Sequence, residues 1–141
     1  MSSETVRVSA ADRSQEKPLG NSVLIVDDDV NLARLLRTIL RTAGYQVLTA
    51  SDGEEALRML DDASVDVIVL DLRMPRMDGR EFFRELKARR NHAPVLIASA
   101  YGARTAQLEL GADAAIEKPF EPDRLVDAVT ELLQQTGPRP A

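Results

Sequence analysis

The sequence of 141 residues has few of the side chains on which many kinds of functional site depend. It has no cysteine, so disulfides, thiolate metal ligands and thiol nucleophiles are excluded within the chain. Its single histidine, His92, cannot form a zinc site alone. No apolar run is long enough to cross a bilayer, and the amino-terminal residues lack the apolar core of a signal peptide. We therefore expect a cytoplasmic protein without a membrane segment.

The chain also lacks an excess of positive charge. Its net charge is −5 and its pI is about 4.9, which argues against a surface that binds nucleic acid directly. The basic cluster formed by Arg84, Lys87, Arg89 and Arg90 fits the solvated face of a helix. At this length the chain can form one domain with some tail, so we expect a single site to carry the function.

Short apolar runs that alternate with amphipathic segments make up the middle of the chain. Apolar residues recur at helical spacing after each run, whereas the runs themselves alternate too little for strands with one wet face. Five such alternations predict parallel strands joined by right-handed crossovers, with helices on both faces, which is a doubly wound α/β fold. The predicted strands are 23–26, 45–50, 65–70, 95–98 and 114–117, and the predicted helices are about 32–43, 53–60, 79–90, 103–110 and 122–133.

Both ends of the chain fall outside this alternation. Residues 1–20 are rich in Ser, Glu, Arg and Ala without a sustained period, which predicts a flexible tail. Residues 136–141 contain glycine and prolines and are typical of a tail or the start of a linker. The folded domain is therefore predicted at 21–135. Because no DNA-binding motif follows Gln135, we expect a stand-alone protein that acts by contacting a partner.

Polar residues with matching chemistry follow four of the five strands: Asp27 and Asp28, Asp71, Ser99 and Lys118. The carboxyl ends of parallel strands meet at one edge of a sheet, where ligands bind. Two carboxylates about 4 Å apart repel by roughly 4 kcal/mol at an effective dielectric near 20, so this cluster needs cations. A lysine and Mg²⁺, which prefers carboxylates, water and phosphate oxygens, meet that need. Asp71 is then placed to attack phosphorus as a nucleophile, and the Ser99 hydroxyl to bond a phosphoryl oxygen.

Each of these residues also has a purely structural interpretation. Asp28 or Asp29 can cap the first helix, Ser99 can satisfy a turn, and Lys118 can be a surface lysine before Pro119. We favour a functional site because suitable residues follow four strands in the expected order.

Four motifs carry a resemblance to a known family. LIVDDD, LDLRMPRMDG, VLIASA and GADAAIEKPF occur in this order over roughly residues 21–135. In their order and spacing they resemble the receiver domain of two-component response regulators. The resemblance implies a flavodoxin-like (βα)5 fold with the strands in the order 2-1-3-4-5. It also implies a signalling module in a phosphorelay rather than an enzyme.

The resemblance assigns the metal site and the phosphoacceptor. It makes Asp71 the acceptor of a phosphoryl group from a sensor histidine kinase or a phosphotransfer protein. It implies that Asp28, Asp71 and the backbone carbonyl of Arg73 bind Mg²⁺ directly, and that Asp27 acts mainly through water.

The resemblance also assigns the switch and the output. Ser99 is implied to be the switch hydroxyl, and Lys118, joined to Pro119 by a cis peptide bond, to bind the phosphoryl group. A downstream protein effector is implied as a partner. We expect a monomer or a weak dimer that depends on phosphorylation.

The sequence departs from the family pattern at two places. Many receivers have an aromatic residue three positions before the conserved lysine, and here that residue is Ala115. The path from Ser99 to Lys118 is also short by close to one helical turn, which predicts a truncated fourth helix. We expect phosphorylation to draw Ser99 and its loop toward the new charge, with Tyr101 or the short helix moving in place of an aromatic ring. Arg73 and Tyr101 are expected to set the phosphoryl lifetime, an idea that an unchanged lifetime after replacing both would disprove.

Three other functions compete with a phosphorylated switch. The first alternative is a pseudo-receiver that binds partners without phosphate; the complete set of site residues argues against it, whereas Ala115 and the short helix argue for it. An aspartyl-nucleophile phosphatase usually carries a cap over its cleft, and no segment here is long enough. A flavodoxin-type electron carrier is disfavoured because residues 27–29 would repel a flavin phosphate.

Overall fold

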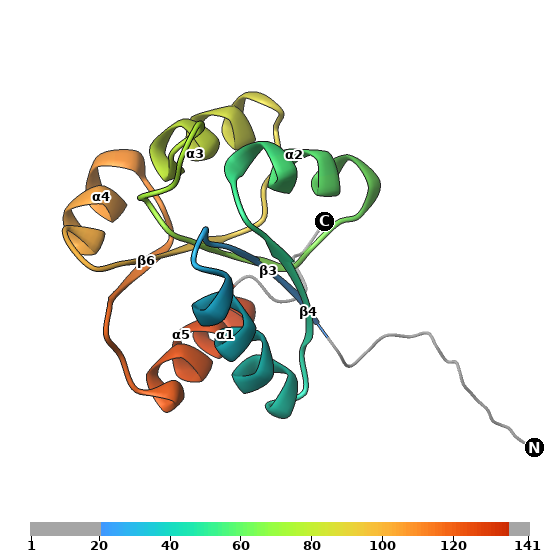
Figure 1. The fold of residues 1–141 in the computed structure, drawn as a ribbon, viewed down its shortest axis with the longest axis vertical. Helices are drawn as coiled ribbons and strands as arrows, with labels where there is room; N and C mark the ends of the chain where they lie inside the picture. Colours follow the sequence, from blue (N-terminus) through green and yellow to red (C-terminus); the bar gives the residue numbers. More distant parts are fainter. Residues whose placement is uncertain (1–20, 136–141) are drawn as a thin grey trace, which may run out of the picture.

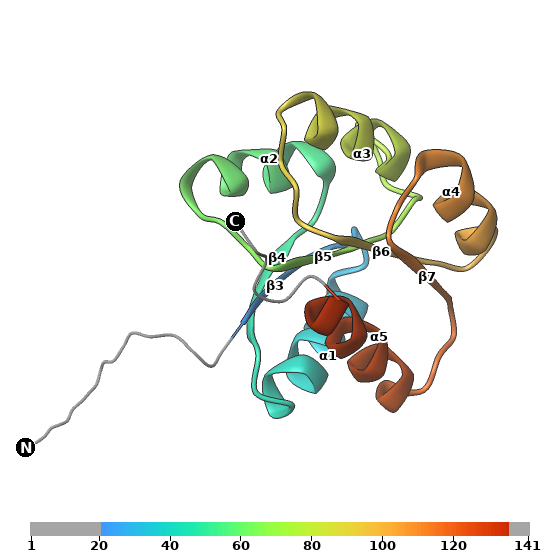
Figure 2. The ribbon, with the colours of Figure 1, turned by 180° about the vertical axis from the view of Figure 1, so that it is seen from behind.

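A computed structural model describes residues 21–135, which form one sheet with helices on both faces (Figures 1 and 2). The predicted tails, 1–20 and 136–141, lie outside the described residues. Numbered as in Figure 1, the strands are β3 (Ser22–Val26), β4 (Gln46–Ala50), β5 (Val67–Leu70), β6 (Val95–Ser99) and β7 (Ala114–Glu117). The helices are α1 (Val30–Thr42), α2 (Gly53–Asp62), α3 (Gly79–Ala88), α4 (Ala103–Leu110) and α5 (Pro122–Gln135).

The sheet has the predicted topology. All four strand pairs are parallel and the order is β4-β3-β5-β6-β7, which is 2-1-3-4-5 when the described strands are counted along the chain. Helices α1 and α5 cover one face, and α2, α3 and α4 cover the other, as both ribbon views show. The flavodoxin-like fold is confirmed. Among the described helices, none is both long and apolar enough to cross a membrane.

Two apolar clusters, one on each face, hold the sheet in place. Leu24 of β3 and Phe82 of α3 belong to one cluster, and Leu36 of α1 and Leu125 of α5 belong to the other. Each large aliphatic or aromatic side chain buried in this way contributes about 1.5–3 kcal/mol. Every residue of β5 and β6 is buried, which explains why these strands read as continuous apolar runs.

Several predicted boundaries are wrong by one or two residues. Strand β4 begins at Gln46 rather than Tyr45, whose hydroxyl shares a 2.6 Å hydrogen bond with the Thr130 hydroxyl of α5. Strand β5 begins at Val67 rather than at residue 65. The carboxylate of Asp66, just before the strand, accepts a hydrogen bond from the Ser22 N–H at 2.8 Å. Helix α3 ends at residue 88 because Arg90 has a left-handed φ of 61°.

Three helices begin at an aspartate that caps them. Asp29, Asp52 and Asp78 each accept a hydrogen bond from a backbone N–H three residues later, at the starts of α1, α2 and α3. Helix α4, in contrast, has no side-chain cap; it is flanked by Gly102 and Gly111, and both glycines are left-handed. It has the two turns that the sequence predicts.

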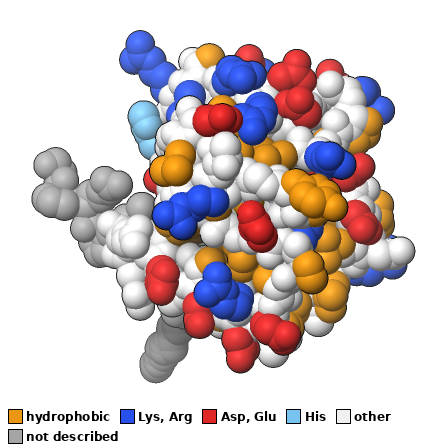
Figure 3. All heavy atoms as spheres, turned by 90° about the vertical axis from the view of Figure 1, so that its left-hand side faces the viewer, with side chains coloured by type: hydrophobic (Ala, Val, Ile, Leu, Met, Phe, Trp, Pro, Cys, Tyr) orange, Lys and Arg blue, Asp and Glu red, His pale blue; other side chains and the backbone are white. Residues whose placement is uncertain are grey.

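The basic cluster of α3 is solvated, as predicted. All four of its members are exposed, and Arg89 pairs with Glu85 of the same helix and with Asp61 of α2. Figure 3 shows acidic and basic side chains interspersed on the face that carries α3 and α4, rather than a continuous basic patch.

Candidate functional site

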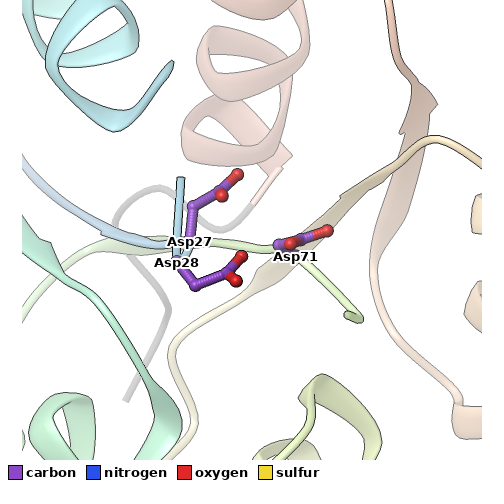
Figure 4. Close-up of side chains that lie close together, drawn as sticks. All are labelled: Asp27, Asp28 and Asp71. Carbon is purple, nitrogen blue, oxygen red and sulfur yellow. The ribbon is translucent and has the colours of Figure 1, made fainter. Parts of the chain in front are cut away.

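Three carboxylates meet where β3 and β5 end. Asp27 and Asp28 follow β3, Asp71 follows β5, and Figure 4 shows their side chains close together. One oxygen from each carboxylate lies within 4.8 Å of the others. The Asp71 N–H donates to the Val26 carbonyl at 2.9 Å, which keeps the two strand ends in register. The structure therefore brings together the carboxylates that the sequence predicts to converge.

Lys118 brings a positive charge to this pocket from the end of β7. Its Nζ lies 2.9 Å from Oδ2 of Asp27 and 3.5 Å from Oδ1 of Asp71. Its backbone N–H donates to the Ser99 carbonyl at 2.9 Å, which joins the ends of β6 and β7. The bond between Lys118 and Pro119 is cis, as the resemblance implies.

The pocket contains more negative than positive charge. Burial raises the pKa of Asp71, and the charge on Asp27 raises it further, while Lys118 and a hydrogen bond from the Arg73 N–H act in the opposite direction. Burial alone would lower the pKa of Lys118, but its contacts with Asp27 and Asp71 outweigh burial and raise it. The lysine therefore stays protonated at neutral pH, and one ammonium group faces three carboxylates.

The donor set suits a hard divalent cation. The group that can hold a metal consists of Asp27, Asp28 and Asp71, with no imidazole or thiolate among its ligands. Oxygen-only sets favour Mg²⁺ or Ca²⁺ over Zn²⁺ or Cu²⁺. An open hollow beside this group is lined by Asp28, Asp78 and residues 72–75. Arg73 thus borders the same hollow as Asp28.

Asp29 has a structural role, which settles one alternative that the sequence leaves open. Its carboxylate accepts from the Leu32 N–H at 3.0 Å and caps α1. Its own N–H donates to Oδ1 of Asp27 at 2.9 Å and so orients that carboxylate. Asp28 is exposed and does not cap the helix, which leaves its oxygens open to a ligand.

Ser99 is the last residue of β6, and Tyr101 lies on the loop that leads from it to α4. The Ser99 side chain is only 2% exposed, yet its hydroxyl has no hydrogen-bond partner within residues 21–135. Tyr101 is 74% exposed, and the Arg73 guanidinium lies 5.7 Å from its ring centroid. The loops after β5 and β6 therefore touch beside the pocket. The influence of this contact on phosphoryl lifetime stays a prediction.

Sequence reasoning missed a second ion pair near the site. Asp52, which directly precedes the helix predicted at 53–60, is buried and pairs with Arg76 in the loop after Asp71. An arginine within a proline-containing turn does not by itself predict an ion pair, because nothing in the sequence indicates which carboxylate the arginine contacts.

Comparison with known proteins identifies the family. Residues 23–130 match the response regulator receiver domain. The chain belongs to this family. A receiver domain is a signalling module rather than an enzyme in the usual sense, and its family implies a histidine kinase as partner.

Individual relatives agree with this assignment. The chain is 41% identical over 119 residues to the transcriptional regulatory protein CpxR of Klebsiella pneumoniae, covering 82% of this chain and 50% of that protein. The chain thus spans about half the length of such curated relatives. The receiver domain of the Francisella response regulator 1452 has a TM-score of 0.78 and 33% identity, covering 84% of this chain and 100% of that one. The response regulator TrrA of Thermotoga maritima, solved in complex with Mg²⁺-BeF, has a TM-score of 0.74 and 33% identity, covering 80% and 99%.

Proposed function

We propose that this receiver domain accepts a phosphoryl group on Asp71 from a sensor histidine kinase or a phosphotransfer protein. The observation that carries the proposal is the position of Asp71, which lies beside the Lys118 ammonium and two further carboxylates. A carboxylate oxygen attacks phosphorus, the bond from phosphorus to the donor's imidazole nitrogen breaks, and its electron pair stays on that nitrogen. The product is an acyl phosphate on Asp71.

Mg²⁺ bound in the acidic pocket would neutralise charge on the phosphoryl oxygens. We assign its direct ligands to Asp28, Asp71 and the backbone carbonyl of Arg73. Asp27 is assigned an indirect role through water, because one of its oxygens accepts from the Asp29 N–H and the other from Lys118. Asp28 makes neither of these two hydrogen bonds and is exposed, so its oxygens are accessible to a metal ion as direct ligands. The Mg²⁺-BeF complex of TrrA supports the same cation.

Lys118 and Ser99 would bind the oxygens of the phosphoryl group once it is on Asp71. The lysine is charged and already touches Asp71, so it is placed to pair with a phosphoryl oxygen. The Ser99 hydroxyl, buried without a partner within the described chain, gains one if it moves to that group. This movement would switch the interaction with a downstream protein effector. Action in the cytoplasm, as a monomer or a weak phosphorylation-dependent dimer, belongs to the same proposal.

Mass spectrometry after incubation with Mg²⁺ and a small phosphodonor tests the acceptor. We expect the wild type to gain one labile phosphoryl group and Asp71→Asn to gain none, because an amide cannot form the acyl phosphate. Asp62→Asn is the matched control, since it removes one negative charge from an exposed position on α2. A wild type that stays unmodified, or an equally labile group on Asp71→Asn, would contradict the proposal. The first of these results would favour the pseudo-receiver alternative.

A further inference from the structure

The loop that follows Asp71, residues 72–78, is joined to the start of α2 by an ion pair. The Arg76 guanidinium donates to Oδ2 of Asp52. Asp52 is 6% exposed, and its Oδ1 accepts from the Glu55 N–H at 2.8 Å. One carboxylate therefore caps α2 and holds the loop at the same time. A buried carboxylate without a cation beside it destabilises the folded state. Loss of the Arg76 guanidinium would therefore leave the charge of Asp52 uncompensated.

The loop needs such a contact because of its backbone. Arg76 has a φ of 64°, a left-handed conformation that disfavours residues other than glycine. The next residue, Met77, packs on the first residue of α2: a Cβ added to Gly53 would lie 2.9 Å from the Met77 Sδ. We call the following four residues the α2 latch: Asp52, which caps α2, Gly53, which begins it, and Arg76 and Met77 on the loop.

The base of the same loop is fixed beside the reactive carboxylate. The Gly79 N–H donates to the Leu72 carbonyl at 2.9 Å. A Cβ on Gly79 would clash with the Asp71 carbonyl oxygen, so the two backbone segments are in direct contact here. On the Asp71 side of the loop, only residues 73–75 lie between this fixed base and the α2 latch. Arg73, which lines the open hollow together with Asp28, is the first of them.

We propose that Asp52 and Arg76 are positioning residues for the receiver site. Their ion pair holds residues 73–75 so that the backbone of Arg73 faces the Asp71 carboxylate and the cation bound there. Loss of the pair weakens Mg²⁺ binding and slows phosphoryl acceptance, although neither residue touches the reacting atoms. The inference rests on the proposed function, whose ligand set includes the Arg73 carbonyl.

Two substitutions remove the ion pair while preserving local structure. Asp52→Asn keeps a good helix cap but loses the charge. Arg76→Gly loses the guanidinium but adopts the left-handed backbone freely. In the unphosphorylated protein we expect each to weaken Mg²⁺ affinity about tenfold, the low end for partners that orient metal ligands. The double variant should be no weaker than either single one, because both remove the same contact. Arg76→Lys, which keeps the charge, should restore part of the affinity.

Amide hydrogen exchange of Arg73 provides a readout that needs neither metal nor phosphate. We expect faster exchange in both variants, because the loop that carries the Arg73 N–H is held less firmly once the ion pair is lost. Arg90→Gly is the matched control: Arg90 is the other described non-glycine residue with positive φ, and it follows the far end of α3. This control should match the wild type in Mg²⁺ affinity and in Arg73 exchange.

The outcomes separate this inference from the proposed function. Unchanged Mg²⁺ affinity and Arg73 exchange in Asp52→Asn and Arg76→Gly would overturn the role of the α2 latch, whatever the wild type does with a phosphodonor. Equal effects of Arg90→Gly would overturn it too, since loop glycine content alone would then explain the result. A wild type that accepts no phosphoryl group while Arg73 exchange responds as expected would instead refute the proposed function and leave the latch as a determinant of loop position.

Discussion

At the scale of single residues, Asp71 is a carboxylate whose charged form is disfavoured by the fold. Burial raises its pKa, and the neighbouring charge of Asp27 adds to this, while Lys118 compensates only in part. A carboxyl group with a higher pKa in the folded than in the unfolded state stabilises the fold only when protonated. That stability is present below the unfolded pKa of about 3.9 and is lost as the pH rises through the folded pKa. At neutral pH the ionised Asp71 carboxylate therefore lowers the free energy of unfolding.

The first prediction is that Asp71→Asn is more stable than the wild type at pH 7 without divalent cations. We expect a gain of roughly 1 kcal/mol in the free energy of unfolding, as is common when an unfavourable charge is removed. The gain should shrink as the pH falls toward the range in which unfolded aspartate takes up its proton. Urea unfolding with a chelator present, repeated across pH values, measures it. Asp62→Asn should show no such gain, and a gain independent of pH would show that charge is not its cause.

The residues of the site differ in how visible they are in the sequence. Asp27, Asp28, Asp71 and Lys118 were predictable because each follows an apolar run, and parallel strands bring such positions to one edge. The α2 latch could not be predicted from the sequence, because its ion pair joins Asp52 and Arg76, which lie in different loops. The sequence also left open whether Asp28 or Asp29 caps α1, since either is a suitable cap.

At the scale of elements, α4 is the helix with the weakest local support. It has eight residues, no side-chain cap and a left-handed glycine at each end. It is held by the buried Ala103 and Ala106 and by an exposed ion pair between Arg80 and Glu109, and such pairs contribute about 0–1 kcal/mol. Its length was predictable from chain spacing, but its dependence on α3 through Arg80 was not. An element held this weakly is suited to move when the adjacent loop changes.

The second prediction of this section concerns that movement. We expect phosphorylation to shift the backbone amide resonances of residues 99–110, because Ser99 is drawn toward the new charge and the loop and α4 follow. Ser99→Ala should still accept the phosphoryl group but lose most of these shifts. Amides of residues 36–42 in α1, on the other face of the sheet and more than one turn beyond Asp27 to Asp29, serve as the internal control. Shifts confined to Asp27, Asp71 and their neighbours would contradict the idea, as would full shifts in Ser99→Ala.

At the scale of the whole molecule, the apolar clusters on the two faces act against the repulsion of the carboxylates between them. The clusters hold β3 and β5 in register, so Asp27, Asp28 and Asp71 stay close although each would be better solvated apart. In the unfolded chain these residues are separated by up to 44 positions and bind a cation weakly (71 − 27 = 44). A divalent cation therefore binds the folded state selectively and stabilises it.

The last prediction follows from this linkage. At a Mg²⁺ concentration about 100 times the dissociation constant, the free energy of unfolding should rise by roughly 2.7 kcal/mol, and a chelator should reverse the gain. Thermal unfolding with increasing MgCl₂ measures it, and NaCl at matched ionic strength controls for screening of surface charge. Asp28→Asn should lose most of the gain, because it removes an assigned ligand, while Asp62→Asn should keep it. An equal stabilisation by NaCl would show that general screening, and not a site at the strand ends, explains the effect.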